Sequence, residues 1–153
     1  MKTVLLVSPD ESLRSRLLRA LGDRSVFTAS TDDEALKTIR VTEVEVVVKE
    51  ASPPIREVPT FIGRLRSICP NAVVINVMPA AETSPDYESA ADAADFVLLQ
   101  PFTARHLQDV LRQAEDKLRL LQEVAAFRSI RPPGSLPRAT ATASSESRSL
   151  RMP

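Results

Sequence analysis

The run Glu45-Val46-Val47-Val48-Lys49-Glu50 decides the fold of this chain. Three consecutive valines without polar alternation favour a strand that is buried on both faces, as in the middle of a parallel sheet. Pro53 and Pro54 cannot donate hydrogen bonds to a neighbouring strand, so this strand ends by about Ser52. Glu50 is therefore predicted at the carboxyl end of a central strand, where open α/β sheets place their ligands.

Short apolar runs alternate with helical patterns on both sides of this strand. Further strands are predicted at residues 3–7, 26–29, 72–77 and 96–99, and helices at 11–21, 32–39, 59–69 and 87–94. In the first helix, the face expected to be buried carries Leu13, Leu17, Leu18 and Leu21. Strands and helices that alternate with short connections predict an α/β fold. We expect a doubly wound, five-stranded parallel sheet with helices on both faces.

A longer helical pattern follows the last strand, from an N-cap at Thr103 to about Phe127. At about 1.5 Å per residue it is longer than a small sheet can cover. Its apolar residues are spaced four, three, four, three and four, as in a coiled-coil seam: Leu107, Leu111, Ala114, Leu118, Leu121 and Ala125. The first half is expected to pack on the sheet. The second half is predicted to lie beyond it, either as a seam, which we favour, or as a fraying amphipathic end, so that Leu118, Leu121 and Val124 face water.

Composition limits the function classes. The chain has 153 residues, zero formal net charge and a single cysteine, which argues against a nucleic-acid-binding surface and a disulfide framework. The first seven residues are too short a segment for a signal peptide or a membrane span, so a cytoplasmic protein is expected. We predict a globular domain at residues 1–121, a helical extension at 122–131 and a disordered Pro/Ser/Arg tail at 132–153.

The sequence lacks the residues that most catalytic chemistries need. Phosphate-binding loops need glycine at strand-to-helix turns, and Gly22, Gly63 and Gly134 occupy no such turn. The only histidine, His106, is expected to be a solvated residue in the first turn of the last helix. Cys69 is expected to be packed and inert, and no cluster of residues has metal-ligand spacing.

Four short blocks follow one another along the chain: Val4–Val7 with Ser12–Arg14, Thr28–Ala29 with Glu34–Leu36, Val46–Pro54, and Pro101–Phe102. In this order and spacing they resemble the receiver domains of two-component response regulators, over residues 2–121. The resemblance implies a sheet of the flavodoxin-like strand order. In that family three carboxylates hold Mg²⁺, one of them accepts a phosphoryl group, a lysine neutralises its charge and a Ser or Thr hydroxyl reports it.

Transferred to this sequence, nearly every position of that chemistry has changed. The acidic pair corresponds to Ser8 and Pro9 with Asp10 just beyond, the phosphoacceptor to Glu50, the hydroxyl to Val77, the lysine to Gln100, and the aromatic switch to Val97, beside Phe96. We call Ser8, Pro9, Asp10, Glu50, Val77 and Gln100 the Glu50 pocket. Because Mg²⁺ needs several oxygen ligands and Glu50 is the only clearly placed one, neither a metal nor phosphorylation is expected there.

Glu50 has two interpretations. Its carboxylate either mimics a phosphoryl group and holds an active-like state, or is a solvated charge at the end of a strand. We favour the second, because a charge shifts an equilibrium only through differential contacts and Val77 and Gln100 cannot provide them.

The resemblance implies a non-enzymatic pseudo-receiver without a cofactor, which binds a protein partner or a second copy of itself. The expected surface is the fourth helix, fifth strand and fifth helix, with candidate contacts at Tyr87, Phe96, Leu107, Leu111, Leu118, Leu121 and Val124. Two alternatives are a phosphotransfer receiver that uses Glu50 and Asp10 unconventionally, and the N-terminal regulatory domain of a longer signalling protein. No DNA-binding motif follows the last helix, which disfavours a self-contained transcription factor.

Overall fold

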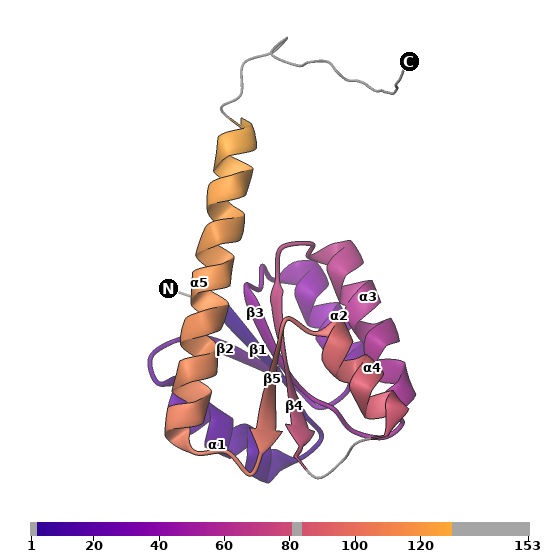
Figure 1. The fold of residues 1–153 in the computed structure, drawn as a ribbon. Coiled ribbons are helices and arrows are strands. Elements are labelled where there is room, and N and C mark those ends of the chain that lie inside the picture. Colours follow the sequence, from indigo (N-terminus) through magenta and orange to yellow (C-terminus); the bar gives the residue numbers. More distant parts are fainter. Residues whose placement is uncertain (1–2, 81–83, 130–153) are drawn as a thin grey trace. The chain divides into compact units, whose positions relative to one another are not determined.

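Five parallel strands form the sheet of this protein (Figure 1), seen in a computed structural model that describes residues 3–80 and 84–129. The strands are β1 (Thr3–Val7), β2 (Ser25–Ala29), β3 (Val46–Glu50), β4 (Val73–Pro79) and β5 (Phe96–Gln100). Their order is β2-β1-β3-β4-β5, and every pair of neighbours is parallel, which confirms the predicted flavodoxin-like sheet. The predicted tail, residues 132–153, lies outside the described residues.

Helices cover both faces of the sheet. The helices are α1 (Glu11–Leu21), α2 (Asp32–Val41), α3 (Val58–Ile68, after the short 3₁₀ helix η1 at Ile55–Glu57), α4 (Pro85–Ala93) and α5 (Ala104–Ser129). Helices α2, α3 and α4 lie on one face (Figure 1), where Leu36, Phe61 and Leu65 pack against Val47 and Val74 in one core. The side chain of Gln108 on α5 donates to the carbonyl of Ala20 at 2.6 Å and ties α5 to α1.

The helix starts follow from capping residues that the sequence displays. The Asp10 carboxylate accepts from the backbone N–H groups of Ser12 and Leu13, at 2.9 and 3.3 Å. The Thr31 hydroxyl accepts from the N–H of Glu34 at 3.1 Å, as the capping-box pattern predicts. At α5, the Thr103 hydroxyl accepts from the N–H of His106 at 3.1 Å, which gives the histidine the first-turn, exposed position that was expected.

Some sequence expectations need correction. Leu18 is 40% exposed, because it is turned about 100° around α1 from Leu17, which faces the core. Strand β4 continues past Val77 to Pro79, and α4 begins at Pro85 rather than Tyr87. A proline at the first helical position loses only an N–H that would be unpaired there anyway.

The side chain of Asn76 is fully buried in the central strand β4. Its Nδ2 donates to the carbonyl of Ala90 at 2.7 Å. That carbonyl lies in the last turn of α4, and the N–H of Ala94 donates to Ala91 instead. The amide therefore satisfies a helix-end carbonyl and fixes α4 on the sheet. The other side-chain atom, Oδ1, has no hydrogen-bond partner among the described residues.

The carboxylate of Asp95, whose side chain is 10% exposed, connects helices on the two faces of the sheet just before β5. It accepts from Arg66 of α3 at 3.2 Å, from Lys117 of α5 at 2.5 Å, and from the backbone N–H of Val74 at 2.8 Å. Burial alone raises the pKa of the Asp95 carboxyl, but the hydrogen bonds from Lys117 and Val74 and the charge of Arg66 outweigh it and hold the pKa below its usual value.

Helix α5 runs through two compact units of the chain, which meet between Arg119 and Leu120. In the first unit, Leu107, Leu111, Ala114 and Leu118 are buried. Leu118 is only 2% exposed, so the expectation that it faces water is wrong. In the second unit, the exposed large apolar residues of the described helix are Leu120 (59%), Val124 (48%) and Phe127 (68%), which we call the distal stripe. Within the described part of the chain, no helix is long and apolar enough to cross a membrane.

Candidate functional site

The carboxyl ends of β1 and β3 bring two residues of the Glu50 pocket into contact. The hydroxyl of Ser8 donates to Oε1 of Glu50 at 2.5 Å. The same hydroxyl oxygen accepts from the N–H of Asp10 at 3.0 Å, and the guanidinium of Arg14 donates to the Ser8 carbonyl. Ser8 is almost fully buried, so its polar atoms are satisfied by the protein itself.

Asp10 has a structural role in this arrangement. Its carboxylate accepts from two N–H groups at the start of α1, where a negative charge also interacts favourably with the helix dipole. The carboxylate that lies nearest in sequence to the lost acidic pair is thus used as a helix cap. Among residues 3–80 and 84–129, no group of three or more His, Cys, Asp or Glu side chains could hold a metal ion.

The remaining residues of the Glu50 pocket offer little polar chemistry. Val77 is the register partner of Glu50 on β4 and is fully buried, with an aliphatic side chain where a hydroxyl would be required to report a phosphoryl group. Gln100 ends β5, and its backbone carbonyl accepts from the N–H of Ala80 at 3.0 Å. Pro9 is exposed and lines a neighbouring depression.

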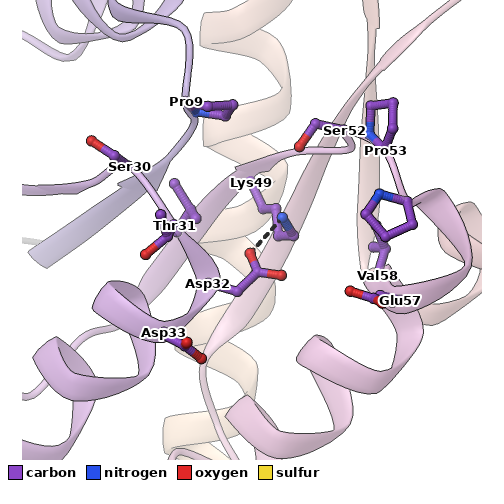
Figure 2. Close-up of a pocket in the computed structure, with 12 residues that line it drawn as sticks. Pro9, Ser30, Thr31, Asp32, Asp33, Lys49, Ser52, Pro53, Glu57 and Val58 are labelled. Atoms are coloured by element: carbon purple, nitrogen blue, oxygen red, sulfur yellow. Dashed lines mark ion pairs between the residues drawn. The ribbon is translucent and has the colours of Figure 1, made fainter.

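A buried lysine lies beside the Glu50 pocket (Figure 2). Lys49 points from β3 toward α2 and α3, and its side chain is only 5% exposed. Its ammonium is 2.8 Å from Oδ1 of Asp32, 3.3 Å from the carbonyl of Glu50, and 5.1 Å from the centre of the Phe61 ring. The ion pair and the aromatic face compensate a charge that burial would otherwise penalise.

The lysine borders a depression of about 360 Å³ at the carboxyl edge of the sheet. Figure 2 shows Asp32, Asp33 and Glu57 around it, on the first turn of α2 and the segment before α3. Because Lys49 is already paired with Asp32 and three carboxylates line the depression, the depression is not suited to a phosphate or another small anion.

Sequence reasoning missed the Lys49–Asp32 pair. The signal was present, since a lysine directly after three buried valines must either leave the strand or find a counter-ion. Asn76, in the apolar run of β4, gives the same signal, and the register pairs it with Lys49 on β3. Neither sequence run shows which helix supplies the partner.

The predicted partner surface is only partly available. Leu107, Leu111 and Leu118 are buried, so they cannot contact a partner and are corrections to the predicted set. Their spacing reflects packing on the sheet, which is the commoner reason for an apolar helical stripe. Tyr87 and Phe96 are half-buried, Leu121 is half-buried, and Val124 is exposed. The ammonium of Lys117 covers the ring of Phe96 at 5.9 Å.

A known sensor kinase is similar to this chain in sequence. No protein-family model matches the sequence. The chain is 31% identical over 119 residues to the sensor kinase CckA of Brucella abortus, a match that covers 75% of this chain and 13% of the kinase. The chain thus spans a small part of the curated relative that it matches.

Solved structures with the same fold include response regulators. The chemotaxis response regulator CheY4 of Vibrio cholerae is 25% identical with a TM-score of 0.65, over 74% of this chain and 98% of that one. A response regulator receiver domain protein from Clostridium thermocellum is 20% identical with a TM-score of 0.67, over 79% and 99%. A protein from Rhodopirellula baltica named adenylate cyclase is 22% identical with a TM-score of 0.75, over 85% and 98%. The fold of this protein is therefore that of the response-regulator receiver domains.

Proposed function

We propose that this protein is a pseudo-receiver: a non-enzymatic signalling module with the receiver fold that binds a protein partner and does not accept phosphate. The hydrogen bond between Ser8 and Glu50 carries the proposal. It joins the two strand ends where a receiver holds Mg²⁺, and it does so with a hydroxyl in place of a carboxylate.

The physical reason is that the Glu50 pocket lacks the positive charge that transfer of a phosphoryl group requires. Transfer of a phosphoryl group requires positive charge to stabilise the oxygens of the transition state, normally from a metal ion and a lysine. In this chain Asp10 caps α1, Gln100 replaces the lysine, and Lys49 is paired with Asp32. A phosphoryl group at Glu50 would meet none of the required cations.

Exposure to a small-molecule phosphodonor with Mg²⁺, followed by intact mass spectrometry, tests this proposal. The wild-type chain is expected to keep its mass, and a stable or hydroxylamine-sensitive adduct on Glu50 would overturn the proposal. A receiver domain with the complete set of acids, hydroxyl and lysine shows that the donor works. A variant of this chain with Ser8→Asp, Pro9→Asp, Glu50→Asp, Val77→Thr and Gln100→Lys supplies the same set on this scaffold and is expected to gain the adduct.

The partner surface we propose is the distal stripe of α5. Each of its three residues is at least as exposed as Val124, at 48%. Monomeric proteins seldom expose a contiguous apolar stripe without a use for it. Leu120, Val124 and Phe127 are spaced four and three, which suits helix-to-helix pairing with a second copy.

A further inference from the structure

Three adjoining depressions form one groove between α2 and α3. The first is the depression beside Lys49, the second holds about 320 Å³ and the third about 470 Å³. Asp33 lines all three, and Leu36 and Arg64 line the second and third, so the depressions lie next to one another along the two helices. We call this feature the α2–α3 groove.

The charge of the α2–α3 groove reverses along its length. On α2, Asp33 in the first turn is followed by Lys37 and Arg40, each one turn further along the same face. On the other side, Glu57 precedes α3 and Arg64 lies about two turns later. Because both helices begin at the carboxyl edge of the sheet, the acidic ends coincide there and the basic ends coincide at the opposite end.

These groove charges are not used by the domain itself. Lys37, Arg40 and Arg64 are exposed, and none has an ion pair with another residue of the described chain. By contrast, Arg24, Arg66 and Lys117 all pair with carboxylates. The basic end thus holds three uncompensated cations around Leu36 and the half-buried Ile68.

The geometry points to a docking site for one amphipathic helix of a partner protein, with acidic residues in its first turns and basic residues in its last turns. Acidic first turns would meet Lys37, Arg40 and Arg64, and basic last turns would meet Asp33 and Glu57. An apolar side chain on the same face of the partner would cover the half-buried Ile68.

This charge order also fixes the direction of the partner helix. Its N-terminus lies at the basic end of the α2–α3 groove and its C-terminus at the carboxyl edge, antiparallel to both α2 and α3. An acid-first, base-last helix is the arrangement that its own dipole favours. The antiparallel direction also places the negative end of the partner's dipole beside the positive ends of α2 and α3.

The acidic end of the α2–α3 groove favours a protein helix over a polyanion as its partner. A nucleic acid or an anionic membrane presents negative charge along its whole length, and Asp32, Asp33 and Glu57 would repel it over half of the groove. A second groove of the same kind fits poorly too, because two hollows leave a void between them. A single helix matches both the shape and the charge reversal.

Binding of a designed helical peptide tests the inference. The peptide has about 16 residues, with Glu in its first turns, Lys in its last turns and a stripe of Leu along one face. Titration into the ¹⁵N-labelled chain is expected to shift backbone amide signals of α2 and α3, with a Kd of roughly 10–500 µM. A spin label at the peptide N-terminus is expected to broaden the amides near Arg40 and Arg64 and to spare those near Glu57.

Matched variants separate the groove from general charge effects. Lys37→Glu with Arg64→Glu is expected to weaken binding at least about tenfold. Arg19→Glu with Arg105→Glu makes the same change in net charge on exposed residues of α1 and α5 and is expected to leave binding unchanged. The same peptide with Glu and Lys exchanged is expected either to bind more weakly or to bind in the reverse direction, with its N-terminal spin label near Glu57.

Four outcomes would overturn the inference. The two double variants could lose binding equally, or the peptide could shift only amides of other elements. The label on the original peptide could broaden the amides near Glu57 instead, or duplex DNA or anionic vesicles could bind the groove more tightly than the peptide. The inference deepens the proposed role as a partner-binding module and rests on it. The two fail separately, because a phosphoryl adduct on Glu50 is detected by mass and does not depend on the peptide.

Discussion

Lys49 and Asp32 form an ion pair whose two members differ in their access to water. The side chain of Lys49 is 5% exposed, whereas that of Asp32 is 40% exposed. If the lysine is removed, the carboxylate can be hydrated. If the carboxylate is removed, an ammonium remains buried without a counter-ion, which is the costly case for buried charges.

We therefore predict an asymmetry between the two substitutions. Asp32→Ala is expected to lower the free energy of unfolding by about 2–4 kcal/mol, and Lys49→Met by less than about 1.5 kcal/mol. Asp33→Ala removes a neighbouring first-turn acid that has no ion pair within residues 3–80 and 84–129, and it serves as the control for helix-dipole effects. Urea denaturation measures all three, and an equal or larger loss for Lys49→Met would contradict this description of the pair.

Asp95 gives the stability of the protein a predictable dependence on pH. Its pKa lies below the usual value of 3.8 in the folded protein, so its contribution to stability is present above about pH 4 and is lost as the pH falls through the folded pKa. Asp95→Asn is expected to cost about 1–3 kcal/mol at pH 7, since its partners Arg66 and Lys117 are partly exposed.

Unfolding in urea at pH 7, 5 and 3 checks this second prediction. The stability difference between wild type and Asp95→Asn is expected to be constant from pH 7 to 5 and to shrink at pH 3. Asp92→Asn, on the exposed face of α4, is expected to change little at any pH. A difference that grows in acid would show that the pKa of Asp95 is not lowered by folding.

At the scale of elements, the distal stripe of α5 is predicted to mediate self-association. Changing Leu120, Val124 and Phe127 to Ser is expected to abolish any concentration-dependent increase in mass measured by light scattering, with little change in the melting of the globular domain. The control Leu18→Ser with Val41→Ser removes other exposed apolar residues and is expected to retain association. A wild-type monomer at every concentration would contradict the prediction.

Helix α5 also shows what the sequence could and could not predict about an element. The spacing of Leu107, Leu111, Ala114 and Leu118 correctly identifies one face of the helix. Spacing does not tell where the surface that buries this face ends, and Leu118 was assigned to the wrong side of that limit. The distal stripe begins at Leu120, in the second compact unit, and the seam spacing does not include that residue.

For the whole molecule, the parallel sheet with helices on both faces followed from the alternation of short apolar runs and helical patterns, and its strand order followed from the resemblance to receiver domains. The places of Ser8 and Glu50 at the ends of β1 and β3 followed from the sequence, but the hydrogen bond between their side chains did not. The partners of Lys49, Asn76 and Asp95 did not follow, because long-range polar contacts depend on how helices are placed rather than on local pattern.

The central claim is that the Glu50 pocket cannot hold Mg²⁺ with a phosphoryl group, and titration with Mg²⁺ and beryllofluoride, a phosphoryl mimic, tests it most directly. Amide signals of the ¹⁵N-labelled chain report binding at each strand end. We predict no saturable shift at Ser8, Asp10, Glu50 or Val77, because the available oxygens are used in the Ser8–Glu50 hydrogen bond and the α1 cap. Saturable, Mg²⁺-dependent shifts at these four residues would contradict the account.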